Sequence, residues 1–331
     1  MKISFPFVTC GSGSDTWTYT LAKALQIKGV DTEIQPFPHL LQYNPITARA
    51  FYKTNADVIH TNSWAGTGFH KHAKKNVCTE HHVVHDQLLA SYKSMGQKAF
   101  HKMVYLFEKW AFESASVITT PSEYTKQKVK EHFKLDSTRI YNGIDTTVFC
   151  NLENDEILDP ANHNKVKLFF VGNLSKRKGA DLLPKIMNKL GDNFVLYTTV
   201  GLQSHMPVQD DRIVSIGKVS LDELVKWYNY CDIFLFPSRM EGFGLTVCEA
   251  MACGMPVVTT RSTALPEVLE DKKGGYLCEI DDADDFANKI KLLANSPQAM
   301  KAFSEHNVIR VQNEFSMELM AERYIQLYQH L

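Results

Sequence analysis

The sequence predicts an α/β protein made of two domains, each with a parallel sheet covered by helices. Three observations support this fold class. The chain has 331 residues, which is more than one hydrophobic core usually fills. Short apolar runs alternate with amphipathic stretches, as in repeated strand–helix–strand units. This alternation occurs twice, and a polar segment separates the two series.

The first half of the chain begins with a strand and then alternates helices and strands. Lys2 and Pro6 interrupt the first apolar run, which favours a strand over a secretory signal peptide. Because helical connections separate most of the strands, we expect parallel pairing. Strands are predicted over residues 2–8, 31–37, 58–61, 76–79 and 116–120, and helices over residues 15–28, 97–115 and from Ser122 onward.

The second half repeats the scheme. Several of its strands are apolar along their whole length, as expected for strands that helices cover on both faces. Strands are predicted over residues 166–171, 193–199, 213–216, 233–237 and 257–260, and helices over residues 179–190, 221–230 and 245–253.

The polar segment 151–165 (NLENDEILDPANHNK) is predicted to be the linker between residues 1–150 and 151–315. Residues 316–331 form a predicted amphipathic helix, because Leu319, Met320, Tyr324, Leu327 and Tyr328 recur at helical spacing. This helix could pack on its own domain or cross back to the first one.

Composition and charge narrow the class of protein. No stretch approaches the ~20 apolar residues of a membrane span, so we expect a cytoplasmic protein. The seven cysteines are scattered without a C-x-x-C pair, which indicates reduced packing residues. Residues 1–150 carry 17 Lys and Arg against 12 Asp and Glu, and the remainder carries 19 against 25. The basic half favours an anionic partner such as a phospholipid surface or a lipid-linked diphosphate, although uneven solubilising charge would look the same.

Residues 237–258 (PSRMEGFGLTVCEAMACGMPVV) carry the most informative pattern. They place a glycine-bearing turn between an apolar strand and a helix, which is where ligands bind in open α/β sheets. The helix start near Gly244 suits a diphosphate. Glu249, one turn inside the helix, is predicted to accept hydrogen bonds from a ribose diol, and Glu241 to face a donor sugar. The alternative is that Glu241 is a solvated loop residue and Glu249 a helix-surface residue.

A second predicted anion site is the segment GNLSKRKG, residues 172–179. Three adjacent cations at a helix start would add to the positive end of the helix dipole, and a bound anion would relieve this conflict. We therefore predict that Arg177 and Lys178 bind a diphosphate. A solvated basic turn is the alternative.

The segment Gly11-Ser-Gly13-Ser14-Asp15 follows the first predicted strand. It is a poor dinucleotide fingerprint, because Thr16 stands where a third glycine would be. It fits a loop that approaches a phosphate or sugar at Gly13, and equally a turn in which Ser14 or Asp15 caps the helix.

The segment Glu80-His81-His82-Val-Val-His85-Asp86 places three histidines and two acids after a predicted strand. A metal site is one interpretation. Adjacent residues such as His81 and His82 point apart, however, and the segment is not H-E-x-x-H. A histidine that acts on sugar hydroxyls or proton transfer is the preferred interpretation.

Together these motifs resemble those of retaining glycosyltransferases of family 4, which have the two-domain GT-B fold. The resemblance covers nearly the whole chain. It rests on Glu241-Gly-Phe-Gly-Leu through Glu249 (E-x7-E), on residues 249–258, on Lys178-Gly179 and on Asn142-Gly-Ile-Asp145.

The resemblance implies a hexosyltransferase with two Rossmann-like domains facing across a cleft, and a terminal helix that crosses back to the first. The implied catalytic residues are His81, Glu241 and Lys178, with His82 as the alternative to His81. The implied donor-binding residues are Gly13, Asn173, Arg177, Lys178, Lys218, Val219, Glu241, Gly242, Phe243, Gly244, Leu245 and Glu249. Among these, Lys218 and Val219 would read the base through backbone groups.

The implied donor is a UDP- or GDP-sugar, and the implied acceptor is a glycan or lipid-linked molecule of cell-surface polysaccharide or glycolipid synthesis. Relatives usually carry Gly-Arg where this chain has Gly172-Asn173, so Arg177 would have to supply the missing phosphate cation. No Asp-x-Asp metal site is evident among these motifs, so we expect no metal and no other cofactor, nor a nucleic-acid partner. Cations and the helix dipole would stabilise the leaving diphosphate, which would take the acceptor proton while the anomeric configuration is retained.

Two alternatives remain from the sequence: a nucleotide-sugar epimerase of GT-B shape, and a non-catalytic nucleotide-sugar-binding protein. The segment 92–112 adds a question about location, because it sets lysines beside many apolar residues. It fits a helix that covers the sheet, and it also fits a surface that rests peripherally on anionic lipid.

Overall fold

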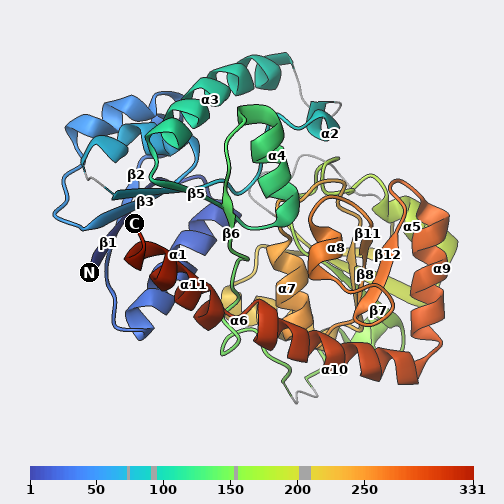
Figure 1. The fold of residues 1–331 in the computed structure, drawn as a ribbon. Helices are drawn as coiled ribbons and strands as arrows, with labels where there is room; N and C mark the ends of the chain where they lie inside the picture. Colours follow the sequence, from blue (N-terminus) through green and yellow to red (C-terminus); the bar gives the residue numbers. More distant parts are fainter. Residues whose placement is uncertain (73–74, 91–94, 153–155, 201–209) are drawn as a thin grey trace. The chain divides into compact units, whose positions relative to one another are not determined.

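The computed structural model describes residues 1–72, 75–90, 95–152, 156–200 and 210–331. Within these residues the chain forms two compact units (Figure 1). The first unit contains residues Met1–Gly143 and Phe315–Leu331, and the second contains Ile144–Glu314. This division places the boundary between Gly143 and Ile144, seven residues before the predicted boundary at residue 150.

The first unit is built on a six-stranded parallel sheet in the order β2-β1-β3-β4-β5-β6. Its predicted strands are confirmed to within one residue at each end. The strands are β1 (Lys2–Val8), β2 (Asp31–Phe37), β3 (Val58–Asn62), β4 (Lys75–Thr79), β5 (Val117–Thr120) and the short β6 (Thr138–Arg139). The α-helices are α1 (Gly13–Ile27), α2 (Gln87–Ala90), α3 (Met95–Ser114), α4 (Glu123–Phe133) and α11 (Met317–Gln329), and four short 3-10 helices lie between residues 39 and 72.

Helix α1 begins two residues earlier than predicted. Its N-cap is Ser12, which makes no side-chain capping bond, so the alternative in which Ser14 or Asp15 caps the helix is wrong. The Asp15 carboxylate instead accepts hydrogen bonds from the amides of Cys10 and Gly11, both at 2.8 Å. Asp15 therefore fixes the loop between β1 and α1.

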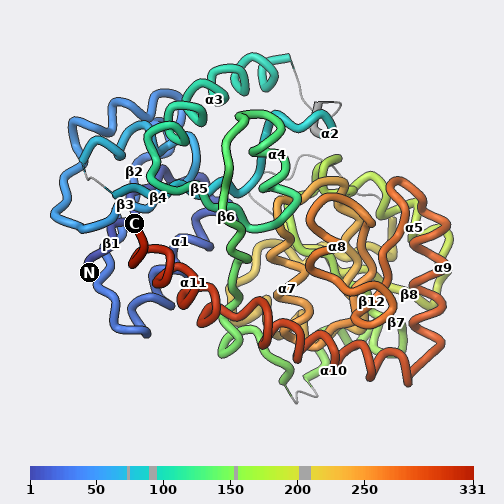
Figure 2. The backbone as a smooth tube through the Cα atoms, viewed as in Figure 1, coloured from blue at the N-terminus to red at the C-terminus, as the bar shows by residue number. Residues whose placement is uncertain are grey.

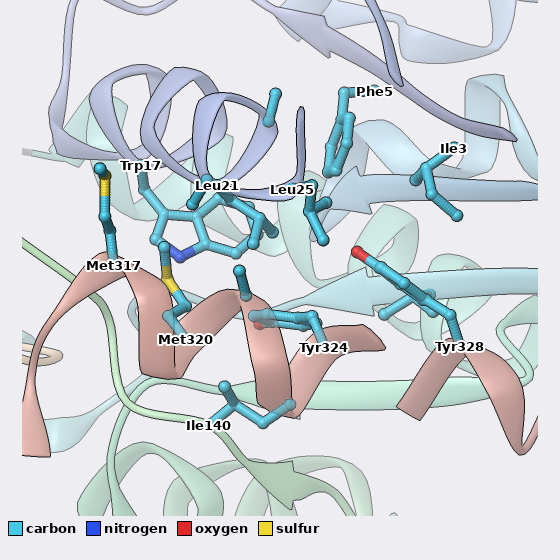
Figure 3. Close-up of a cluster of buried hydrophobic side chains, with 14 of the residues drawn as sticks. Ile3, Phe5, Trp17, Leu21, Leu25, Ile140, Met317, Met320, Tyr324 and Tyr328 are labelled. Atoms are coloured by element: carbon cyan, nitrogen blue, oxygen red, sulfur yellow. The ribbon is translucent and has the colours of Figure 1, made fainter. Parts of the chain in front are cut away.

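The C-terminal helix α11 supplies one wall of the first unit's core, as the crossing-back prediction required. Met320, Tyr324 and Tyr328 pack with Trp17 and other residues of α1 and the sheet (Figure 3). The tube in Figure 2 shows α11, in red, running beside α1, in blue, at the end of the chain. Because these side chains are buried, the first unit is complete only with its C-terminal helix.

The second unit contains another six-stranded parallel sheet, in the order β12-β11-β10-β7-β8-β9. Strands β8, β10 and β11 are buried along their whole length, which confirms the predicted apolar strands. The strands are β7 (Val166–Phe170), β8 (Phe194–Thr199), β9 (Ile213–Gly217), β10 (Ile233–Phe236), β11 (Val257–Thr260) and β12 (Gly275–Cys278). The α-helices are α5 (Leu183–Leu190), α6 (Leu221–Tyr230), α7 (Leu245–Ala252), α8 (Leu265–Val268), α9 (Ala283–Ala294) and α10 (Pro297–Glu314).

The predicted linker 151–165 is part of the second unit, apart from residues 153–155, which lie outside the described residues. The Asp159 carboxylate accepts a hydrogen bond from the Tyr197 hydroxyl at 2.9 Å, and the Leu152 amide donates to Asn229 at 2.7 Å. These bonds to the sheet and to α6 explain why a polar segment is not a linker here.

No α-helix in the described ranges combines the length and the apolar character that crossing a bilayer requires.

Candidate functional site

The candidate site lies on two loops at the carboxyl ends of β7 and β10. These strands are neighbours and pair in parallel, although they are not consecutive in the chain. From β7 the chain proceeds through β8 and β9 on one side, and from β10 through β11 and β12 on the other. The point where the strand order reverses in this way is a topological switch point. The loops after the two central strands lead to opposite sides there, and ligands of open α/β sheets bind between them.

Lys178 and Arg177 meet Glu241 at this switch point. The Lys178 Nζ lies 2.7 Å from the Glu241 Oε1, and the Arg177 Nη1 lies 3.5 Å from the same atom. The Ser238 hydroxyl also donates to this carboxylate, at 2.5 Å. Of the Lys178 and Glu241 side chains, 14% and 11% of the surface is exposed. The sequence predicted these two cations and this acid, and the structure brings them together.

The electrostatics of this cluster favour its charged state. Burial opposes ionisation of Glu241, but Lys178 and Arg177 outweigh it and hold the pKa of the Glu241 carboxyl below its usual range. Burial also lowers the pKa of the Lys178 ammonium, although Glu241 pulls it in the opposite direction. The ammonium additionally lies 4.8 Å from the ring centre of Phe236.

The basic segment 176–178 is a turn and does not begin a helix, so that part of the prediction is wrong. Helix α5 begins only at Leu183, with Pro184 in its first turn. Gly179 has a φ of +74°, and a Cβ there would lie 2.1 Å from the Pro237 carbonyl oxygen. This close approach holds the turn against the β10 loop. The cations are therefore balanced by Glu241 and not placed at a helix dipole.

Helix α7 begins directly after the β10 loop, as predicted. Its N-cap is Gly244, with a φ of +111°, a conformation that favours glycine. The first amides of a helix have no acceptor one full turn back, so they can bind an anion, although the Val247 amide here already donates to the Gly244 carbonyl at 3.0 Å. The loop thus offers both side-chain cations and backbone donors.

Arg239 is a residue that the sequence analysis missed. Its side chain is 7% exposed and pairs with Asp181 through both terminal nitrogens, at 2.7 and 2.9 Å. It also donates to Asp281 at 2.6 Å and to the Lys176 carbonyl. Its backbone amide donates to the Arg177 carbonyl at 2.9 Å. Arg239 therefore links the basic turn 176–178 to the β10 loop.

Glu249 lies in α7 and is bonded to Tyr228 of α6. The Tyr228 hydroxyl donates to the Glu249 Oε2 at 2.9 Å. Burial raises the pKa of the Glu249 carboxyl to about 7, and the Tyr228 bond and the Lys178 charge limit this rise. The carboxylate is thus poised to change charge near neutral pH.

The other predicted donor-binding residues of the second unit lie at the same edge of the sheet. Asn173 follows β7, while Lys218, which is exposed, and Val219, which is half-buried, follow β9. Gly242, Phe243 and Gly244 lie in the β10 loop, and Leu245 is the first residue of α7.

His81 and Gly13 lie in the first unit, after β4 and at the start of α1. The His81 Nε2 lies 2.9 Å from the Asn62 Oδ1, and its ring meets Trp17 edge-on at 4.5 Å between centres. Burial lowers the pKa of His81 to about 3, so this imidazole is neutral. His82 follows with its amide bonded to Glu80 at 2.9 Å.

Models of two glycosyltransferase domain families match this chain. "Glycosyltransferase Family 4" matches residues 33–148, and "Glycosyl transferases group 1" matches residues 165–296. These ranges fall in the first and the second unit, apart from a few residues at the boundary.

Solved structures share the fold over almost the whole chain. Sucrose-phosphate synthase from Thermosynechococcus elongatus has a TM-score of 0.85 at 19% identity, covering 99% of this chain and 98% of that one. HepE of Anabaena, in complex with UDP and glucose, has a TM-score of 0.75 at 17% identity and full coverage of both chains. The chain belongs to the family 4 type of glycosyltransferases, with the GT-B fold.

Curated relatives of this family 4 chain include glycosyltransferases of archaea and bacteria. An uncharacterised glycosyltransferase of Methanocaldococcus jannaschii is 30% identical over 66% of this chain, and the capsular polysaccharide biosynthesis glycosyltransferase CapM of Staphylococcus aureus is 28% identical over 68%. The aligned parts span 60% and 64% of the lengths of these two relatives.

The histidine-rich segment of this glycosyltransferase has protein partners for its charged groups. The His85 Nε2 lies 2.8 Å from the Glu108 Oε2, and Asp86 accepts from the Tyr124 hydroxyl. Within the described residues, no three His, Cys, Asp or Glu side chains are grouped so that they could hold a metal ion. Metal independence of the reaction stays a prediction.

Proposed function

We propose that this chain is a retaining glycosyltransferase that transfers a sugar from a UDP- or GDP-sugar to a glycan or lipid-linked acceptor. The observation that carries the proposal is the pairing of Lys178 and Arg177 with Glu241 at the switch point, beside the start of α7. UDP as donor nucleotide is supported by HepE, which is described in complexes with UDP, with UDP and glucose, and with UDP-glucose. A role in surface polysaccharide synthesis is supported by the name of CapM.

The proposed chemistry needs stabilisation of a leaving diphosphate. The bond between the anomeric carbon and the phosphate oxygen breaks, so negative charge develops on the diphosphate. Lys178, Arg177 and the amides at the start of α7 would stabilise this charge. The acceptor oxygen would then bond to the anomeric carbon on the same face, and the acceptor proton would pass to the leaving phosphate oxygen.

The contacts of Glu241 suggest how the site prepares for its donor. Its carboxylate is paired with Lys178 and Arg177, the two cations that we propose bind the diphosphate. An incoming diphosphate would compete for Lys178 and Arg177, and Glu241 would be released to accept hydrogen bonds from the sugar hydroxyls. Arg177 would in this way supply the positive charge that an arginine would carry at position 173, where this chain has Asn173.

Calorimetry with UDP, GDP and ADP tests the donor site. We expect one of them to bind and Lys178→Ala to weaken this binding by roughly 10- to 150-fold, the range for a lost charge-assisted hydrogen bond. Lys176→Ala is the matched control, because Lys176 is exposed in the same turn. If no nucleotide binds, or if both variants lose the same affinity, the assignment of this site is wrong.

Activity measurements test the reaction itself. With the matching nucleotide-sugar and an acceptor, transfer should persist in EDTA and the product should keep the anomeric configuration of the donor. Loss of activity in EDTA that magnesium or manganese restores would contradict metal independence. An inverted product would contradict retention. Conversion of the donor to an epimer without any acceptor would identify the epimerase alternative.

A surface of α3 supports a second proposal, peripheral binding to anionic lipid. Leu106 and Trp110 are 50% and 49% exposed, whereas Val104 and Phe107 are buried. Lys102 and Lys109 lie on the same exposed face. The predicted apolar stripe therefore divides into a part that covers the first unit and a part that faces outward; residues 92–94 of the segment lie outside the described residues. Apolar side chains among lysines are typical of helices that lie on anionic lipid surfaces.

A further inference from the structure

Tyr228 has a hydroxyl group whose position is explained by Glu249. The residue lies in the last turns of α6 and is fully buried. Its ring contacts the rings of Phe149, Phe169 and Phe234, with centres 5.2 to 6.1 Å away. A phenylalanine would fill such an aromatic cluster equally well, and burying a hydroxyl costs free energy unless it is bonded. The bond to the Glu249 Oε2 at 2.9 Å meets this need.

We propose that Tyr228 is a positioning residue that holds the Glu249 carboxylate in place to receive the ribose diol of the donor nucleotide. This inference rests on the proposed function, in which Glu249 binds the ribose. The Tyr228 bond fixes one carboxylate oxygen, Oε2, and directs the other toward a ligand. A carboxylate fixed in this way loses less freedom when the diol binds than one that can rotate.

The charge of Glu249 depends on the same contact. Donation from Tyr228 favours the ionised form, as does the Lys178 charge, while burial opposes it and brings the pKa of Glu249 to about 7. Among the described residues, the other titratable groups that interact with its charge are Cys248 of α7 and Cys253 at the end of that helix. The carboxylate accepts two hydrogen bonds from a diol better than the acid does, so nucleotide affinity should fall as the pH drops through about 7. Without the tyrosine hydroxyl, this fall should begin at higher pH.

The test compares Tyr228→Phe with Tyr230→Phe in the full-length protein. Tyr230 lies on the same helix, and its hydroxyl bonds to the backbone of Asp159, at 3.0 Å to the carbonyl and 3.3 Å to the amide. Both variants remove one hydroxyl and keep the ring. Calorimetry between pH 6 and 9 would use UDP, or GDP if that nucleotide binds the wild type, and the 2′,3′-dideoxy form of the same nucleotide.

We expect Tyr228→Phe to weaken binding of the ribonucleotide about tenfold at pH 7.5, as for the loss of a hydrogen bond to a charged group. Its binding of the dideoxynucleotide should stay within about twofold of wild type, and the pH at which ribonucleotide affinity falls should move upward. Tyr230→Phe should match wild type with both ligands.

Three results would overturn the inference while the proposed function stands. Tyr228→Phe could bind the ribonucleotide as wild type does, it could lose both ligands equally, or the wild type could bind both ligands with the same affinity. The first excludes a role for the hydroxyl, the second indicates a merely structural role, and the third removes the diol from recognition. A wild type that binds none of the nucleotides would overturn the proposed function as well.

Discussion

Glu241 is held at both its side chain and its backbone. The Lys178 ammonium and the Ser238 hydroxyl bind the carboxylate, and the Glu241 amide donates to the Thr263 Oγ1 at 3.0 Å. Thr263 has a φ of +54°, which is rare for a β-branched residue. Such strain persists only where surrounding contacts hold it in place, and it gathers at functional sites. The strained threonine therefore points to a role in placing Glu241.

Substitution of Thr263 tests this role. Thr263→Ala removes the acceptor of the Glu241 amide and should lower the turnover of transfer roughly tenfold, because in the proposed function a mispositioned Glu241 would lose contacts with the transition state. Thr263→Ser keeps the hydroxyl and should retain most of the activity. Steady-state kinetics on the folded variants would measure both effects. Equal turnover of the two variants would show that the hydroxyl does not matter.

Local motifs and distant contacts differ in how far the sequence can predict them. Glu241 and Glu249 could be found from the sequence, because a strand, a glycine turn and a helix follow one another there. Arg239 acts on Asp181, which is 58 residues away in the chain. Thr263 and Tyr228 likewise act through neighbours that only the folded sheet brings near. Nothing local in the sequence marks such residues.

Elements followed the sequence pattern where that pattern was simple. Fully buried strands such as β10 and amphipathic helices such as α11 were predicted closely. No element was predicted between residues 261 and 315, where the structure has α8, β12, α9 and α10. Helix α10 buries only Phe303, Asn307 and Val311, and one of these is polar. The buried Asn307 donates to the carbonyls of Met255 and Gly274, both at 2.8 Å, so a core position carries no apolar signal.

Helix α3 allows a test of peripheral membrane binding. Vesicles rich in anionic lipid should pellet the protein at low salt, and binding should weaken with salt because exposed charges are screened over about 8 Å at physiological ionic strength. The double variant Lys102→Glu and Lys109→Glu should abolish pelleting. Sedimentation of the protein with these vesicles and with neutral vesicles would measure the effect.

The matched control is Lys126→Glu with Lys130→Glu on α4, which makes the same change of charge. Those two lysines are paired with Glu123 and Asp136, as Lys109 is with Glu113, but they do not accompany exposed apolar side chains such as Leu106. If both double variants bind alike, general charge is responsible and α3 is only structural. If the wild type does not pellet even at low salt, a soluble acceptor is favoured.

Over the whole molecule, the two units place their predicted residues by the same rule. The first unit's order, β2-β1-β3-β4-β5-β6, has its switch point between β1 and β3. Gly13 begins the helix that follows β1, and Asn62, the partner of His81, is the last residue of β3. The second unit has its switch point between β7 and β10. The fold was predictable because both halves alternate apolar strands with amphipathic helices. The position of the boundary was not predictable, because polarity alone cannot distinguish a linker from a surface segment that is hydrogen-bonded to its domain.

Buried histidines make the first unit sensitive to acid. His60 is fully buried between the Tyr328 hydroxyl, 2.6 Å from its Nδ1, and the Thr79 hydroxyl, 2.7 Å from its Nε2. Burial holds the pKa of His60 well below its usual range and lowers the pKa of His70 to about 4. These side chains stay neutral in the folded unit at a pH where the unfolded chain protonates them.

The sign of the resulting pH dependence follows from linkage. A histidine whose pKa is lowered by folding makes its full contribution to the free energy of unfolding above the pKa of the unfolded chain, about 6.5. This contribution is lost as the pH falls toward the pKa in the folded protein. For His60 the loss between pH 7 and 5 should be about 2 kcal/mol, because the unfolded state alone takes up the proton.

In His60→Gln this loss is absent. Urea unfolding followed by tryptophan fluorescence would report mainly on the first unit, which contains Trp17, Trp64 and Trp110. The difference in unfolding free energy between wild type and His60→Gln should therefore narrow by about 2 kcal/mol from pH 7 to pH 5. His163→Gln, at an exposed site of the second unit, should leave the pH dependence of wild type unchanged. A difference that stays constant or widens toward pH 5 would show that His60 is already protonated in the folded protein.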